Sequence, residues 1–271
     1  MSAQESVPRL RAVVLGARGS IPVSGPEYMR YGGSTTCIAI VEGFAIRAFI
    51  DAGTGLMAFR SFGLELAGAI PVFLTHYHWD HIQGVSMLGE VWAGACLFTF
   101  IGPNDPEQML TGAIRPPWFP VALQDAPEPV AFEGIDGPTT VGSITVTAFP
   151  VQHPQGAVGY RIDGPNRSLA IVTDHESSPD YDDVVAEAID GVEVLVHDAQ
   201  YLPEEAASHV GWGHSTWENA TAMAVRMGAD ELILTSHDPT RSDTAVDDMI
   251  QAARSAFLNT VGAEPGLEIA L

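Results

Sequence analysis

Short apolar segments bounded by glycine, proline or polar residues recur along the chain and predict β-strands. Most are rich in valine, isoleucine, leucine or phenylalanine, and they have the length of a strand rather than of a helix. The predicted strands cover residues 11–16, 37–41, 45–50, 71–75, 97–101, 143–149, 157–162, 168–172, 192–196 and 231–235.

Helical patterns in the second half of the chain cover residues 180–189, 216–227 and 244–258. Thr216 is a suitable N-cap for the second of these helices, and Gly228 is a suitable C-cap. Strands on both sides of these segments favour an α/β fold in which two sheets pack together and helices cover the outside. The 271 residues show no repeat or linker, which indicates a single domain over residues 1–271.

Residues 102–142 differ from the rest because they are rich in proline and contain the run Pro116-Pro117-Trp118-Phe119-Pro120. A long irregular stretch is unusual inside a compact domain and is often functional. We consider two interpretations of equal weight. The segment is either a flap over the substrate or a dimer contact, or it is a plain surface excursion.

The chain has 34 acidic residues against 12 basic ones, all of them arginine, and a net charge of −22. Such a surface repels phosphates, which makes long nucleic acid a poor partner, although general acidity that aids solubility gives the same composition. Neither reading excludes a small anion in a locally positive pocket. No apolar run reaches the ~18 residues of a membrane span, and no signal peptide is evident, so we expect a cytoplasmic protein. Cys37 and Cys96 lack metal-ligand spacing and are expected to be buried.

The run His76-Tyr77-His78-Trp79-Asp80-His81 follows the apolar strand predicted at residues 71–75. In an extended segment, residues two apart point the same way, so His76, His78 and Asp80 converge while His81 begins a new turn. Imidazole suits zinc, iron and copper, and a neighbouring carboxylate allows a second ion. The run therefore predicts part of a metal site at the end of a buried strand.

Three more ligand candidates each lie just beyond the end of a predicted strand: His153, Asp174 and His237. Each alone is weak evidence, but with the first cluster they complete two sites. The order His-x-His-x-Asp-His, followed by a distant His, Asp and His, resembles the metallo-β-lactamase superfamily over most of the chain. This resemblance implies an αββα sandwich with the site at one edge.

The same resemblance implies how the ligands are shared between two divalent ions. Asp174 is expected to bridge both ions, which departs from the common zinc β-lactamases and argues against antibiotic hydrolysis. Zinc is the default metal for this ligand set, with manganese or iron as alternatives. The remaining ligands are His76, His78 and His153 for the first ion, and Asp80, His81 and His237 for the second.

Two later segments, residues 195–201 and Gly213-His214-Ser215-Thr216, resemble paired motifs of the tRNA 3′-processing nucleases and related cyclic phosphodiesterases. In that branch the second motif's histidine protonates the leaving oxygen, helped by the acid of the first motif. The corresponding residues here are His214 and Asp198, where Asp198 stands in place of a longer glutamate. Helix capping or another structural role is the alternative for His214, and His197 is expected to be structural. The predicted catalytic residues are His214, Asp198 and Asp80, the last of which also binds metal.

Residues 16–22 and 30–37 are similar to segments of bacterial proteins related to the phosphoribosyl cyclic phosphodiesterases. Within them, Arg18 or Arg30 either meets a phosphate or braces a loop. Asp51, in the turn Asp51-Ala52-Gly53-Thr54-Gly55, is expected to position the metal-site loop rather than to bind metal.

The sequence thus predicts a two-metal hydrolase that cleaves a small phosphodiester, such as a cyclic nucleotide or a ribose cyclic phosphate. A tRNA 3′ endonuclease is disfavoured because no Gly/Lys/Arg-rich insertion is present. Two other readings stay open: a lactone or thioester hydrolase using the same metal-bound hydroxide, and a metal-dependent binding module without catalysis. Trp79, Trp118 and Phe119 either stack on a base or pack internally. The resemblance also implies a homodimer.

Overall fold

The computed structural model describes residues 10–127 and 130–271, whose strands form two sheets, each with parallel and antiparallel pairs. The first sheet has the order β15-β1-β2-β3-β5-β6-β7, with β4 beside β3. Its strands are β1 (Leu10–Gly16), β2 (Cys37–Glu42), β3 (Ala45–Ile50), β4 (Glu65–Leu66), β5 (Ile70–Phe73), β6 (Phe98–Gly102), β7 (Ala131–Gly134) and β15 (Glu268–Ala270). The second sheet has the order β14-β13-β12-β11-β10-β9-β8. Its strands are β8 (Thr139–Val141), β9 (Ile144–Val151), β10 (Ala157–Asp163), β11 (Ser168–Val172), β12 (Val194–Asp198), β13 (Glu231–Thr235) and β14 (Thr260–Gly262).

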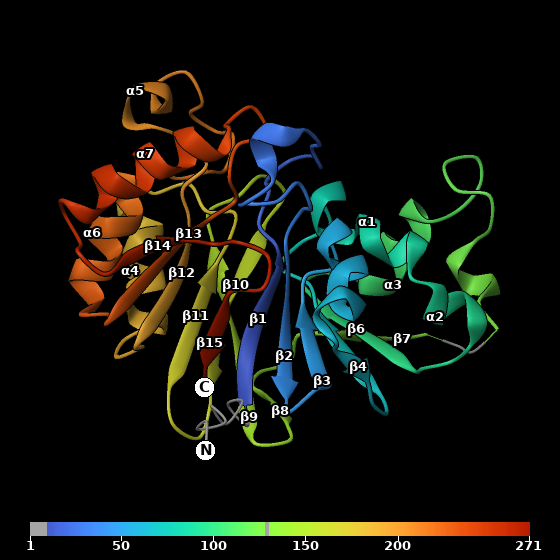
Figure 1. Cartoon of the computed structure of the whole chain (residues 1–271). Helices are drawn as coiled ribbons and strands as arrows, with labels where there is room; N and C mark the ends of the chain where they lie inside the picture. The colour runs from blue at the N-terminus through green and yellow to red at the C-terminus, as the bar shows by residue number, and fades with distance from the viewer. Residues whose placement is uncertain (1–9, 128–129) are drawn as a thin grey trace, which may run out of the picture.

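Helices cover the outer face of each sheet, so the layers run helix, sheet, sheet, helix (Figure 1). Beside the first sheet lie α1 (Trp79–Met87), α2 (Gly89–Ala93) and α3 (Pro106–Ala113). Beside the second sheet lie α4 (Pro179–Ala188), α6 (Trp217–Met227) and α7 (Asp243–Arg254), with the short α5 (Pro203–Ala206) near the loops. The predicted αββα sandwich is confirmed.

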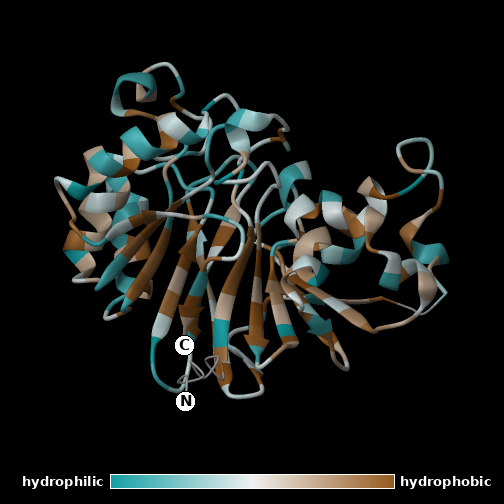
Figure 2. Ribbon diagram, viewed as in Figure 1, coloured by the Kyte–Doolittle hydropathy of each residue, from teal (hydrophilic) through white to brown (hydrophobic). Residues whose placement is uncertain are grey.

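Three apolar clusters hold these layers together. The central one joins the two sheets through side chains such as Ile40 of β2 and Ile171 of β11. The other two lie between each sheet and its helices. Because most strands are buried on both faces, they read as nearly continuous apolar runs, and Figure 2 shows them as the most hydrophobic part of the molecule. Among the described residues, no helix is long and apolar enough to cross a membrane.

The proline-rich segment 102–142 is more regular than its sequence indicates. It contains α3, the 3₁₀ turn Leu123–Asp125, and the strands β7 and β8, which stand at the edges of the two sheets. Leu110, Ile114 and Leu123 are buried in the cluster under the first sheet, so packing overrides the poor local pattern. The caps of α6 agree with prediction: Thr216 accepts a hydrogen bond from the backbone N–H of Asn219, and Gly228 has φ 62°.

Arg18 lies just after β1 and ties this segment to two others, one around Gly32 and one around Asp238 and Arg241. Its side chain has 0% exposure, and its guanidinium donates hydrogen bonds to the carbonyls of Gly32, Asp238 and Arg241 at 2.8, 3.0 and 2.8 Å. Arg30 is half-exposed and forms an ion pair with Asp247. Both arginines therefore act within the protein, which agrees with the bracing interpretation.

Replacing Arg18 with Ala should destabilise the fold by at least about 3 kcal/mol, because it removes the charged donor of three hydrogen bonds, and a hydrogen bond to a charged group contributes about 1.5–3 kcal/mol. Arg30→Ala is the matched control and should cost about 1 kcal/mol or less, since its ion pair is exposed. Urea unfolding followed by circular dichroism measures both variants. Equal losses in the two proteins would contradict the bracing role of Arg18.

Candidate metal centre

The loops beyond several strands bring polar side chains together at one end of the sandwich. His76 follows β5 of the first sheet, while His153 and Asp174 follow β9 and β11 of the second sheet. Because β9 and β11 both pair antiparallel with β10, they run in the same direction and end at the same edge. The topology therefore places these residues, far apart in the sequence, in one cluster.

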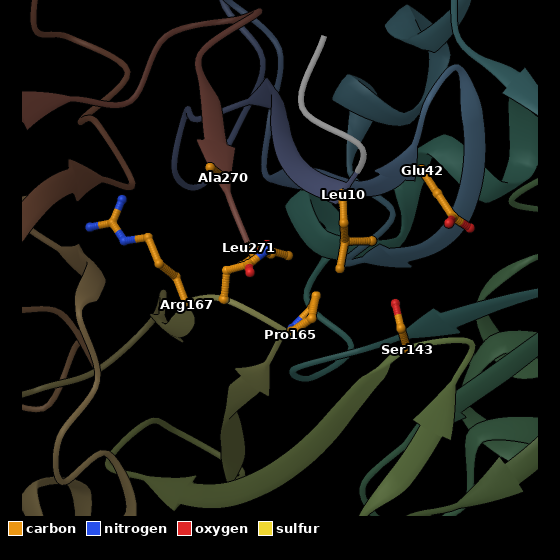
Figure 3. A pocket seen from close by; sticks show the side chains of 8 residues that line it. Leu10, Glu42, Ser143, Pro165, Arg167, Ala270 and Leu271 are labelled. Atoms are coloured by element: carbon orange, nitrogen blue, oxygen red, sulfur yellow. The ribbon is translucent and has the colours of Figure 1, made fainter. Parts of the chain in front are cut away.

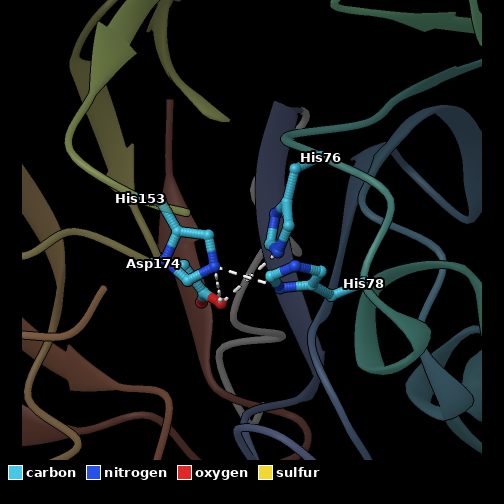
Figure 4. Close-up of side chains that lie close together, drawn as sticks. All are labelled: His76, His78, His153 and Asp174. Carbon is cyan, nitrogen blue, oxygen red and sulfur yellow. Dashed lines mark hydrogen bonds and ion pairs between the residues drawn. The ribbon is translucent and has the colours of Figure 1, made fainter. Parts of the chain in front are cut away.

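The first ligand group contains three imidazoles and one carboxylate, with their candidate ligand atoms within 4.8 Å of one another: His76, His78, His153 and Asp174. Figure 4 shows the four side chains pointing toward one another, His76 and His78 from the loop after β5 and the other two from the loops after β9 and β11. Asp174 Oδ2 lies 3.6 Å from His76 Nε2 and 3.7 Å from His153 Nε2. These are the residues expected for a first ion, together with the expected bridging carboxylate.

The second ligand group contains Asp80, His81 and the same Asp174. His81 Nε2 lies 3.4 Å from Asp80 Oδ2 and 3.3 Å from Asp174 Oδ2. The chain is extended only to His78, which is the N-cap of α1, so Asp80 and His81 both lie in the first turn of that helix. The expectation that Asp80 belongs to an extended run with His78 is therefore wrong, although its carboxylate does reach the centre.

Outer hydrogen bonds orient each imidazole and fix which nitrogen faces inward. The Nδ1 atoms of His81 and His153 contact Asp51 Oδ2 and the carbonyl of Gly213, both at 2.8 Å. His76 Nδ1 lies 3.0 Å from Thr75 Oγ1, and His78 Nε2 lies 3.0 Å from Gln155 Oε1. Asp51 thus supports a ligand from outside the two groups, as predicted. Gly213 has φ 87°, and a Cβ there would lie 2.1 Å from His153 Nδ1, so only glycine fits beside this ligand.

The inward nitrogens fit a divalent cation. Nε2 of His76 and Nε2 of His81 are buried and have no hydrogen-bond partner among the described residues. His78 Nδ1 and His153 Nε2 lie only 3.1 Å apart, although the opposite nitrogen of each ring already faces an outer acceptor. Two lone pairs facing each other this closely are stabilised by a cation, and metal-binding histidines show this pattern of outer hydrogen bonds.

The charge around His81 also favours cations. Burial is the largest influence on the pKa of His81 and lowers it, yet Asp174, Asp51 and Asp80 together raise that pKa well above its ordinary value. Burial likewise opposes ionisation of Asp174, but His81 and His214 hold its pKa well below the ordinary value. Three carboxylates around one buried imidazole leave negative charge that bound cations would balance.

His237 does not join either group, which corrects its assignment to the second ion. Its Nε2 lies 2.9 Å from the carbonyl oxygen of Ala263, and its ring packs edge-on against Tyr31 at 5.2 Å between centroids. Ser236 faces the centre instead: it is fully buried, and its Oγ lies 3.5 Å from Asp174 Oδ1. Ser236 and His237, which follow β13, therefore point to opposite sides.

His214 and Asp198 form a pair beside the two groups. His214 Nδ1 donates to Asp198 Oδ2 at 2.9 Å, and His214 Nε2 lies 4.0 Å from Asp174 Oδ2. Burial lowers the pKa of His214 most, but the carboxylates of Asp198 and Asp174 raise it to about 9. The N-cap of α6 is Thr216, so His214 is not the capping residue. The raised pKa favours the protonated form of His214, whose Nε2 faces Asp174.

Backbone N–H groups hold Asp198 in place: those of His175, Gln200 and Ser215. Asp198 is fully buried, so its carboxylate acts on its surroundings through His214 rather than by direct contact with solvent. His197 turns away from the centre, and its Nδ1 contacts the carbonyl of Asp198 at 2.8 Å. The structural interpretation of His197 agrees with this position.

Two adjoining hollows lie beside the centre. The first, of about 440 Å³, is lined by Ser20, Tyr77, His78, Trp79, Asp80, Asp174 and His214. The second, of about 370 Å³, is lined by Ser20, Ile21, His78, His153, Gln200, Tyr201, His209, Trp212, His214, Asp238 and Pro239. Among the described residues, no arginine and no residue of segment 102–142 lines either hollow.

Trp79 is 54% exposed and borders the first hollow, so it faces this hollow rather than the core. Trp118 is 71% exposed away from both hollows, and Phe119 stacks on Trp92 with 5.6 Å between ring centroids. A base-stacking role for Trp118 or Phe119 therefore finds no support in this structure. Trp212 is the aromatic residue that the sequence reasoning missed, although it stands two residues before His214.

A larger hollow, of about 470 Å³, opens between the two sheets at another place (Figure 3). Its lining includes Leu10, Pro165, Arg167 and Leu271, and no histidine or cysteine lines it in the described part of the chain. Neither of the two candidate ligand groups borders it, so the metal chemistry belongs to the hollows beside the histidines.

Comparison with known proteins agrees with this geometry. The profile of the β-lactamase superfamily domain matches residues 47–237. A ribonuclease Z from Mycobacterium bovis is 25% identical over 245 residues, which cover 80% of this chain and 83% of that protein. A ribonuclease Z from Gemmatimonas aurantiaca is 36% identical, but only over 105 residues, so the match spans about a third of that relative (32%).

Solved structures show the same fold over almost the whole chain. A diphosphatase of the PhnP family has a TM-score of 0.72 at 19% identity, covering 97% of this chain and 98% of that one. The metallo-β-lactamase-fold protein YhfI from Bacillus subtilis has a TM-score of 0.71 at 17% identity, covering 97% of this chain and 99% of that one. The short form of human tRNase Z has a TM-score of 0.67 at 16% identity, covering 96% and 98%. With its two histidine and aspartate groups at the loop end of an αββα sandwich, the chain belongs to the metallo-β-lactamase superfamily.

Proposed function

We propose that the protein is a metal-dependent phosphodiesterase that acts on small substrates. The observation that carries this proposal is the His214–Asp198 pair, whose protonated imidazole stands 4.0 Å from the carboxylate shared by both ligand groups. Breaking a phosphodiester bond releases an alkoxide, which needs a proton as it departs. A lactone or thioester hydrolase can use the same metal centre, but it has less need of a donor at this place.

Each part of the site has a role in this reaction. Two divalent ions, zinc by default in the imidazole-rich group, would activate a water and stabilise negative charge on the phosphoryl oxygens. Asp174 holds both groups at a fixed separation because it belongs to each. His214 donates its Nε2 proton to the leaving oxygen, and Asp198 is the positioning residue that orients the ring and favours its charged form. Asp80 acts as a ligand and not as an acid or base.

The surroundings favour a substrate that carries an aromatic ring and no second phosphate. Tyr201 and His209 stack at 4.2 Å between centroids, and Trp212 packs edge-on to His209 at 4.9 Å. These rings form one wall of the second hollow, and Trp212 is 62% exposed. Because no arginine lines the described parts of either hollow, a nucleobase suits this wall better than an additional phosphate group.

A long RNA is a less suitable substrate, although several relatives are named ribonuclease Z. The net charge of −22 repels a polyanion, and an extended nucleic acid would need many cationic contacts outside the centre. A cyclic nucleotide places one phosphodiester and one base within the reach of the two hollows. We therefore propose a cyclic nucleotide ahead of a ribose 1,2-cyclic phosphate.

Replacing His214 with Ala should lower kcat/KM about 100-fold or more for a 3′,5′-cyclic nucleotide, whose alkoxide leaving group needs a proton. Bis-(p-nitrophenyl) phosphate should lose far less, because p-nitrophenolate departs without one. Metal content, measured by mass spectrometry, should stay unchanged. If His214→Ala spares the cyclic nucleotide and the wild-type protein cleaves lactones faster, the lactone hydrolase is the better reading.

Asp198→Asn is the companion variant and tests positioning through the pH profile. Asp198 raises the pKa of His214, so its neutral replacement should lower that pKa. An acid catalyst must be protonated, and activity falls as the pH rises through its pKa. The alkaline limb of kcat/KM should therefore move to lower pH in Asp198→Asn. A limb that stays in place would show that Asp198 has only a structural role.

Trp212→Ala should raise KM for a cyclic nucleotide about tenfold, since stacking a base on an aromatic ring is worth ~1–3 kcal/mol. KM for ribose 1,2-cyclic phosphate, which has no base, should not change. Trp118→Ala is the control, because Trp118 is exposed and lies outside both hollows. A preference for the base-free substrate, with no effect of Trp212→Ala, would contradict this assignment.

A further inference from the structure

The two ligand groups at the metal centre are unequal. The first offers three imidazole nitrogens and a carboxylate, while the second offers one imidazole, from His81, and the carboxylates of Asp80 and Asp174. Asp174 is a member of both groups. The second group therefore has one protein ligand fewer than the first, and oxygen rather than nitrogen predominates in it.

Ser236 is a buried side chain that borders the shared carboxylate of the second group. It is fully buried, and its Oγ approaches Asp174 Oδ1 at 3.5 Å from the end of β13. Its φ of 57° makes the chain turn sharply at this residue. A neutral serine hydroxyl is not among the usual protein ligands of zinc, which are thiolate, imidazole and carboxylate.

The neighbouring histidine cannot supply the missing nitrogen in this arrangement. The backbone of His237 is fixed on both sides, since its N–H donates to the carbonyl of Ala17 at 2.9 Å and its own carbonyl accepts from Gly19 at 3.1 Å. Its Nε2 contacts the carbonyl of Ala263 and its ring packs against Tyr31, and it is not among the residues whose ligand atoms gather around Asp174. Bringing its ring to Asp174 would break these contacts.

From this we infer that the protein binds its two ions with different strength and different preference. The first group holds one ion tightly and suits zinc, because imidazole nitrogens predominate in it. The second group, left open at Ser236, binds its ion more weakly and favours a harder cation such as Mn²⁺, which prefers carboxylate and water ligands. This inference rests on the metal-binding part of the proposed function and not on the choice of substrate.

The experiment is a metal titration of the full chain after chelation, first with Zn²⁺ and then with Mn²⁺. Calorimetry gives the affinities, and mass spectrometry gives the metal retained after desalting. The wild-type protein should keep one Zn²⁺ per chain, and its second Zn²⁺ should bind at least about 100-fold more weakly, since loss of even an outer supporting group costs 10–100-fold. Mn²⁺ added to the protein that already holds one Zn²⁺ should bind at the second group. The electron paramagnetic resonance spectrum of Mn²⁺ should then change from that of the free ion.

Ser236→His should raise the affinity for the second Zn²⁺ ion, because it adds an imidazole beside Asp174. Histidine also adopts a positive φ more readily than most residues, so it suits this backbone position. Ser236→Asp is the second variant, with a shorter side chain that also tolerates this backbone, and it should strengthen the second site if the larger ring does not fit. His237→Ala is the matched control and should keep the wild-type pattern of one tight and one weak ion.

Several outcomes would overturn the inference. Two Zn²⁺ ions of equal affinity in the wild-type protein would show that the second group is already complete. Loss of one ion in His237→Ala would identify His237 as a ligand after all. No gain in either Ser236 variant, with both folded by circular dichroism, would show that Ser236 does not border the second site. A wild-type protein that binds no ion would overturn the proposed function as well, whereas the other results leave the phosphodiesterase proposal intact.

Discussion

The candidate metal centre is organised around negative charge that is buried beside the imidazole of His81. Asp51, Asp80 and Asp174 surround His81 with almost no access to water. Carboxylates in such a place are costly unless cations or hydrogen-bond donors balance them. The Thr75 hydroxyl and the backbone N–H groups of Thr75 and Ser20 supply part of that balance. The rest requires positive charge, which cations held by the inward nitrogens would supply.

The two halves of this centre come from different sheets. His76, His78, Asp80 and His81 follow β5, whereas His153, Asp174, Asp198 and His214 follow or end strands of the second sheet. The apolar cluster between the sheets, with Ile40 and Ile171 among its members, fixes how far apart these halves stand. The distances between the two halves of the centre are thus set by the packing of apolar side chains in the core, since close-packed interiors transmit small displacements.

Much of this was visible in the sequence, and the exceptions have physical causes. Buried strands read as apolar runs, and the spacing of the 76–81 run is specific, so the sandwich and most ligands could be predicted. The helix beginning at Trp79 was missed because alternation and a first helical turn both bring Asp80 toward His76. His237 was misplaced because consecutive residues point in opposite directions, and the turn at Ser236 decides which one faces inward. Packing, which overrides a proline-rich sequence, explains the regularity of residues 102–142.

Gly213 joins two parts of the site through a single peptide. Its carbonyl holds the ring of His153, its N–H is held by Glu176, and the next residue is His214. Whatever orders this short segment acts on a metal ligand and on the proton donor at once. By thermodynamic reciprocity, a substrate that immobilises the segment must change the affinity for the first ion by the same factor as that ion changes the affinity for substrate. Metal loading and substrate affinity would then be one linked equilibrium in this protein.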